Sequence, residues 1–145
     1  MYVFIYEFAA SITSLIIFVV PIYIFILKNT ISILLISLSG LLSLITRLYR
    51  IYKKEYVMDS IIVYLDIIFA ILAFIIYLIY PFGCYEIVLS AFCLMIIAAI
   101  MSWNIFNINL IVESFILQMI GHLLVAFSLI DYTQTILYNN TLSKY

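Results

Sequence analysis

The stretch SIIVYLDIIFAILAFIIYLIY, residues 60–80, decides the fold of this chain, because Asp66 is its only charged side chain. A hydrocarbon core about 30 Å thick is crossed by about 20 apolar residues in a helix. Five such runs follow one another, and their predicted bounds are Ala9–Leu27, Ile31–Leu48, Ser60–Tyr80, Cys84–Met101 and Asn107–Ile130. The runs are apolar on every face, which favours helices over the alternating pattern of a membrane β-strand.

The composition indicates the same class of protein. Of the 145 residues, 9% are charged and 69% are hydrophobic, whereas a soluble domain contains about 25% charged residues. Because the connections are short, we expect a single all-α transmembrane domain over residues 1–145, built as a bundle of five helices. The break at Ser102–Asn104 is the weakest, so a four-helix bundle with one long bent helix is the alternative.

The basic residues predict the orientation of the chain in the membrane. Arg47, Arg50, Lys53 and Lys54 lie together at the second connection, out of six Lys and Arg residues in all. The positive-inside rule places this connection in the cytoplasm, so the N-terminus is expected inside and the C-terminus outside or in a lumen. The external tail then carries Asn139 in an N-glycosylation sequon, which makes it a candidate glycosylation site.

The source membrane stays open at this point. The chain contains 13 Tyr but only 3 Gly and 2 Pro, and its richness in Ile, Tyr and Asn fits an AT-rich coding sequence. Three sources fit this bias: a large DNA virus of protists, an AT-rich bacterium and an organellar genome. A viral protein would imply a virion or endoplasmic-reticulum membrane, and a bacterial one the inner membrane.

Small and polar residues predict which helix faces point inward, because helix association in lipid relies on them. The second span carries Ser39 and Ser43 on one face with Gly40 beside them, and the third carries Ala70 and Ala73 in line with Asp66. We expect these faces to form the packing surfaces of the bundle.

Asp66 is the most informative single residue, because it lies about six residues inside its span. An acid at such a depth costs about 2.5–3.5 kcal/mol on insertion scales, so we expect it to be neutral, partnered or facing water. Arg47 and Asp59 are the candidate ion-pair partners in this region, although the head of Arg47 is expected to reach the cytoplasm or meet Asp59 instead. Asp66 is either a structural carboxyl that fixes helix register or a proton or ion site.

Gln118 and His122 lie one helical turn apart near the middle of the last span and complete a candidate intramembrane polar or proton site with Asp66. The predicted depths of Asp66 and His122 differ by about 10–15 Å, so a link would need Gln118, serines and water. Two unrelated structural contacts would have the same layout. One histidine cannot supply the three or four protein ligands of a zinc site, so we expect no metal and no cofactor.

Three fragments resemble a pattern of membrane hydrolases of the alkaline ceramidase and adiponectin-receptor type. That pattern has Ser-x-x-x-His on one span, Asp on the next and His-x-x-x-His on the last. The corresponding residues here are Ser43 and Arg47, then Asp66, then Gln118 and His122. The resemblance implies a seven-span zinc hydrolase, but Arg47 and Gln118 replace two of the three metal-binding histidines and five spans are predicted. On this resemblance, zinc hydrolysis is expected to be lost.

Three functions remain open. We expect a non-enzymatic structural or assembly component of a membrane, with lipid, further copies of the chain or other membrane proteins as partners and no nucleic acid. The alternative is a subunit of a small oligomeric ion, proton or solute transporter that uses Asp66 and His122. The third is a degenerate hydrolase of the type above. No catalytic residue is predicted, because His122 is the only histidine and the sequence has no phosphate-binding glycine loop.

Overall fold

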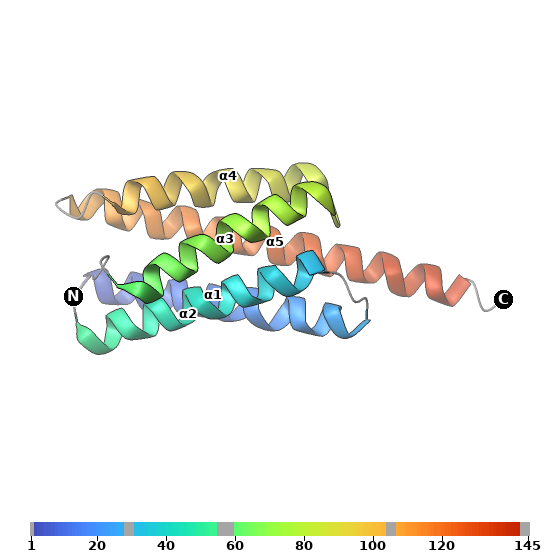
Figure 1. The fold of residues 1–145 in the computed structure, drawn as a ribbon, viewed down its shortest axis with the longest axis horizontal. Coiled ribbons are helices and arrows are strands. Elements are labelled where there is room, and N and C mark those ends of the chain that lie inside the picture. Colours follow the sequence, from blue (N-terminus) through green and yellow to red (C-terminus); the bar gives the residue numbers. More distant parts are fainter. Residues whose placement is uncertain (1, 28–30, 55–59, 104–106, 143–145) are drawn as a thin grey trace.

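The computed structural model describes residues 2–27, 31–54, 60–103 and 107–142. Within them, five helices run up and down beside one another (Figure 1). Their bounds are α1 (Tyr2–Leu27), α2 (Ile31–Lys53), α3 (Ile61–Ile79), α4 (Tyr85–Ser102) and α5 (Ile108–Leu142). Each helix is long and apolar enough to cross a membrane. The protein is therefore an integral membrane protein with an all-α bundle, as predicted. The four-helix alternative is wrong, because α4 and α5 pack side by side.

Three helices extend beyond their predicted ends. The observed and predicted ends are Tyr2 against Ala9 for α1, Lys53 against Leu48 for α2, and Leu142 against Ile130 for α5. The predicted bounds stop where charged or polar residues begin. A helix can continue through such residues, because its backbone hydrogen bonds are satisfied internally whatever the side chain. Glu7 consequently lies within α1 and not before it.

The helices form an open ring. α3 packs on α2, α2 on α1, α1 on α5, and α5 on α4. Figure 1 shows α3 running diagonally, from beside α2 at the end where α1, α3 and α5 begin to beside α4 at the opposite end. We call the first of these the N-terminal end of the bundle and the second, which contains the Pro81–Gly83 turn, the turn end.

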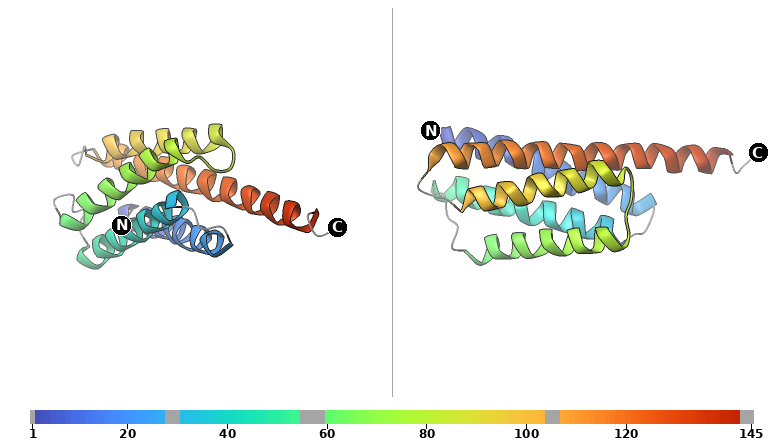
Figure 2. Two further views of the ribbon diagram at one scale, coloured as in Figure 1. Left: turned by 45° about the vertical axis from the view of Figure 1, so that its right-hand side comes forward. Right: turned by 90° about the horizontal axis from the view of Figure 1, so that it is seen from above.

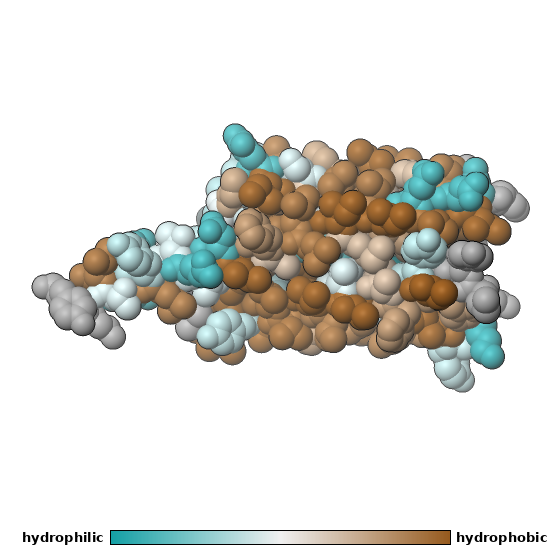
Figure 3. Space-filling view, turned by 180° about the vertical axis from the view of Figure 1, so that it is seen from behind, coloured by the Kyte–Doolittle hydropathy of each residue, from teal (hydrophilic) through white to brown (hydrophobic). Residues whose placement is uncertain are grey.

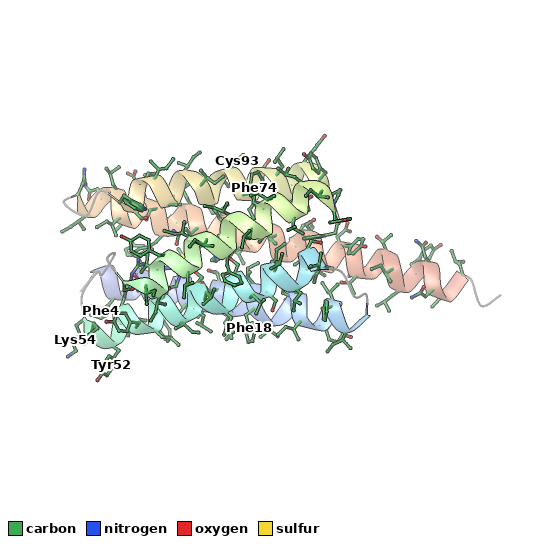
Figure 4. All side chains as sticks on the ribbon, viewed as in Figure 1. Phe4, Phe18, Tyr52, Lys54, Phe74 and Cys93 are labelled. Atoms are coloured by element: carbon green, nitrogen blue, oxygen red, sulfur yellow. The ribbon has the colours of Figure 1, made fainter. Side chains whose placement is uncertain are left out.

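Aromatic rings join α3 to α4 near the turn. The rings of Phe74 and Phe92 are 4.9 Å apart between centroids, and Tyr77 stacks on Tyr85 at 5.9 Å. Figure 4 labels Phe74 where the two helices come together. From this contact the helices diverge toward the N-terminal end.

α1 and α2 approach most closely around Gly40. A Cβ atom at this position would lie 2.8 Å from backbone atoms of Ile17 and Phe18, so the two backbones touch where no side chain intervenes. Close approach at a small residue is the usual way in which helices associate in lipid. Ser37 Oγ adds a hydrogen bond of 2.9 Å to the carbonyl of Phe18. The inward face predicted around Gly40 is therefore confirmed as a helix contact.

α5 continues past the other four helices at the turn end (Figure 2). Its 35 residues span about 52 Å at 1.5 Å per residue, well beyond a hydrocarbon core of about 30 Å. Figure 3 shows apolar residues over the middle of the bundle and hydrophilic ones at its ends and on the projecting part of α5. This distribution fits a bundle that crosses the membrane along its long axis.

Candidate functional site

A buried cluster of charges joins α1 to α2 near the N-terminal end. Arg47 Nη1 donates to Glu7 Oε2 at 3.1 Å, and Arg50 Nη1 donates to Glu7 Oε1 at 3.3 Å. Glu7 is 2% exposed and Arg47 is 3% exposed. Charges removed from water are tolerated only when they are paired and hydrogen-bonded. One carboxylate between two guanidinium groups therefore fixes the register of these two helices.

Arg47 also connects this cluster to α5. Its Nε donates to Ser14 Oγ at 3.2 Å, and its Nη2 donates to Gln118 Oε1. The guanidinium carbon lies 5.5 Å from the centroid of the Phe115 ring, a cation–π contact. The planar, five-donor guanidinium suits several partners at once. One side chain of α2 thus binds both α1 and α5.

Asp66 on α3 lies beside the charge cluster. Ser43 of α2 lies beside its carboxyl group, and Arg47 and Arg50 lie within electrostatic range of it. Ser43 Oγ also lies 3.3 Å from Ser14 Oγ. Arg47, Ser14 and Ser43 are therefore joined by hydrogen bonds, and Asp66 of α3 lies next to this network of α1 and α2.

The ion pairs differ from those that the sequence predicts. Within the described residues, Arg47 and Arg50 both pair with Glu7, which was not among the predicted partners. The expected escape of the Arg47 head to the cytoplasm is wrong, because its donors are taken up inside the bundle. Asp59, the other candidate partner, lies outside the described residues.

His122 lies one turn beyond Gln118 on α5 and contacts α1. Its Nδ1 is 3.1 Å from Thr13 Oγ1, which is itself 3.0 Å from the Ala10 carbonyl oxygen. A threonine hydroxyl has one hydrogen, and a carbonyl oxygen can only accept. Both bonds are made when Thr13 donates to Ala10 and the Nδ1–H of His122 donates to Thr13. This tautomer leaves Nε2 of the neutral ring as a hydrogen-bond acceptor.

Asp66, Gln118 and His122 line a single cavity of about 750 Å³ in the middle of the open ring. Ser39 and Ser43 are the other polar residues of its wall, and most of the remainder is apolar. Ile71 on α3 and the α4 residues Ile96 and Ile100 line the cavity and are also exposed on the outer surface. The cavity is therefore open between α3 and α4, where the ring of helices is not closed.

The structure brings together the three residues that the sequence singled out, but it adds others that the sequence did not. The spacing of Glu7, Ser11 and Ser14 predicts that Glu7 belongs to the inward face of the first helix, but Glu7 lies outside the predicted span and was not a candidate site residue. Arg50 was assigned to the second connection. The role of Glu7 could have been suspected, because an acidic residue stands so close to an apolar run. The role of Thr13 could not, because nothing in its local sequence distinguishes it from other threonines in membrane helices.

Four residues of the family resemblance line this cavity, namely Ser43, Asp66, Gln118 and His122. The fifth, Arg47, lies behind them and donates a hydrogen bond to Gln118. In the part of the chain that the structure describes, no three His, Cys, Asp or Glu side chains are grouped so that they could hold a metal. Comparisons with protein families, with curated proteins and with solved structures found no match to this chain.

Proposed function

We propose that this chain is a non-enzymatic membrane protein that binds a lipid-like molecule in the cavity between α3 and α4. The observation that carries the proposal is the sideways opening of this cavity, whose rim residues Ile71, Ile96 and Ile100 are exposed on the outer surface. A molecule dissolved in the bilayer can enter by this route without crossing water. The proposal narrows the broader role of membrane component expected from the sequence.

The size of the cavity favours a lipid chain over a helix of another protein. Its volume of about 750 Å³ lies within the range of about 300–1,000 Å³ that is usual for small-molecule sites. A helix about 10 Å wide and 30 Å long would fill roughly 2,400 Å³. A partner helix is therefore larger than the cavity, whereas a single apolar chain is of the size that such sites hold.

The charged residues support a non-enzymatic role. Glu7, Ser14 and Gln118 all bind Arg47, and each of these bonds joins two different helices. Their acceptor oxygens are thus engaged in holding the bundle together. A hydrolase or other enzyme would need some of these groups free to act on a substrate.

Transport, the second function, receives less support from the cavity walls. At the side nearer the turn end, beyond His122, the cavity is lined by Ile17, Ile36 and Val125. A proton or ion that reached His122 from the N-terminal end would next meet apolar side chains. Within the described residues, the polar wall occupies one part of the cavity and does not continue across it.

Binding can be measured with Trp103, the only tryptophan of the chain, which lines the cavity. In nanodiscs of ordinary lipid, added brominated alkyl chains are expected to quench its fluorescence to a plateau at about one chain per protein. Ala70 also lines the cavity, and Ala70→Phe is expected to remove this saturable component because the ring fills the site.

The matched control is Ser90→Phe, which adds the same ring to an exposed position of α4. This variant is expected to quench as the unmodified protein does. Because Trp103 is 60% exposed, some quenching from the surrounding lipid is expected in every sample. Quenching that rises without a plateau, equally in all three proteins, would contradict the proposed binding site.

We further propose that the N-terminal end of the bundle faces the cytoplasm. Lys53 and Lys54 are exposed at the end of α2, which supports this orientation under the positive-inside rule. Arg47 and Arg50 support it less than the sequence suggested, because they are buried among partners. Asn139 is exposed on the projecting part of α5, at the opposite end.

The orientation predicts glycosylation at the C-terminal end. When the chain is synthesised in the presence of microsomes, part of it is expected to gain one glycan that Asn139→Gln removes. The reference is a variant with an acceptor sequon placed before α1, which is expected to stay unmodified. Glycosylation of that N-terminal sequon, with none at Asn139, would reverse the proposed orientation.

A further inference from the structure

The cavity has a polar wall whose hydrogen-bonding groups are not all used within the protein. His122 is 8% exposed and lines the cavity. Its Nδ1 is bound by Thr13, whereas its Nε2 has no partner among the described residues. Thr13 therefore fixes the ring at Nδ1, and Nε2 is left as an acceptor for a molecule bound in the cavity.

Gln118 presents the complementary group one turn away. Its Oε1 accepts from Arg47, which orients the side-chain amide and directs the remaining function of the group, the NH₂ donor, away from that arginine. Gln118 lines the cavity, and no acceptor for its NH₂ group lies among the described residues. A donor and an acceptor on successive turns of α5 thus line the same wall.

We infer that the occupant is a neutral amphiphile with one alkyl chain and a head group that both donates and accepts hydrogen bonds, such as a long-chain alcohol or primary amide. This inference rests on the proposed binding function. A hydroxyl head can donate to Nε2 of His122 and accept from the amide of Gln118. Its chain then lies along the apolar wall toward the opening between α3 and α4.

The charges around the polar wall select against an ionic head group. The Asp66 carboxyl lines the cavity and disfavours a fatty acid or a phosphate. Arg47 and Arg50 lie within electrostatic range of the same carboxyl and disfavour an amine. With Glu7 included, these four groups have formal charges that sum to zero. A charged head of either sign would therefore enter a low-dielectric site in which it meets a like charge as well as an opposite one.

The head-group preference can be tested on the unmodified protein. Hexadecanol, hexadecane, hexadecanoic acid and hexadecylamine, which share one chain length, are made to compete with the brominated chain for quenching of Trp103. The alcohol is expected to bind about three- to tenfold more tightly than the hydrocarbon, as one or two net hydrogen bonds provide. The acid and the amine are expected to bind more weakly than the alcohol.

Two variants assign the preference to its residues. His122→Leu and Gln118→Leu are each expected to reduce the ratio of alcohol to hydrocarbon affinity about two- to threefold, which is half of the total preference in free energy, while the hydrocarbon itself still binds. The matched control is Gln134→Leu, the same change at an exposed position of α5. The affinity ratio is the readout because a general loss of structure would weaken both ligands together.

The outcomes separate this inference from the proposed function. If every probe binds with the same affinity, or if the acid or amine binds best, the inferred head-group chemistry is wrong while the cavity remains a lipid site. The same conclusion follows if either leucine variant leaves the ratio unchanged. If no probe, including hexadecane, competes with the brominated chain, the proposed function itself is overturned. The head-group series requires no substitution, so it decides the question even if a variant does not fold.

Discussion

Glu7→Gln is expected to lower the free energy of unfolding by about 3–5 kcal/mol, which is the usual effect of removing one partner from a buried ion pair. Glutamine keeps the size of the side chain but removes its charge. Arg47 and Arg50 would then remain buried with the carboxylate between them gone. Titration of the protein in mixed micelles with sodium dodecyl sulfate, followed by circular dichroism, measures this loss.

Glu113→Gln is the matched control for this prediction. Glu113 lies on the membrane-spanning part of α5, but it is exposed, so the same change there is expected to alter stability by less than about 0.5 kcal/mol. A double-mutant cycle with Arg47→Gln is expected to give a coupling energy of about 0.5–3 kcal/mol. Equal effects at Glu7 and Glu113, or a coupling near zero, would show that the pair does not hold the bundle together.

Glu7 and Arg47 show why the sequence predicts the helices better than their ends. Apolar runs identify the five spans because lipid requires continuous apolar segments. The same reasoning ends a span at the first charged residue. The first span was therefore predicted to begin at Ala9, and Glu7 was left outside it. A charge can nevertheless lie within a span if a partner from another helix meets it, and that depends on how helices pack.

The residues of the candidate site could likewise be predicted from the sequence, whereas their arrangement around a cavity could not. Asp66, Gln118 and His122 could be singled out because polar residues are rare in apolar runs and are expensive there. Their common cavity could not be predicted, because it depends on the divergence of α3 from α4. Consecutive helices joined by a short turn usually pack along their length, whereas these two meet through Phe74 and Phe92 near the turn.

Gly40→Val is expected to lower stability by about 3 kcal/mol or more, at or above the upper end of the range for overpacked cores. The new Cβ would lie 2.8 Å from backbone atoms of Ile17 and Phe18. A flexible side chain could turn aside, but a helix backbone cannot, so α1 as a whole must move away from α2. The same detergent titration measures the effect.

Two other substitutions test whether this contact, and not added bulk, is responsible. Gly121→Val is expected to cost less than Gly40→Val, because the nearest atom, Cγ of Met95 at 2.7 Å, belongs to a flexible side chain. Ser90→Val places the same side chain at an exposed position of α4 and is expected to be nearly neutral. If Gly40→Val is as stable as Ser90→Val, the close approach of α1 and α2 is incorrect.

Gly40→Val is expected to disrupt the cavity as well as to lower the stability of the protein. Ser43 lies three residues along α2 from Gly40, contacts Ser14 of α1 at 3.3 Å and lines the cavity. If α1 and α2 separate, this contact is broken and the cavity loses the wall that Ser43 forms. Gly40→Val is therefore expected to abolish saturable quenching of Trp103, although the substituted residue does not line the cavity. Saturable binding that survives a measured separation of the two helices would show that the cavity forms independently of this contact.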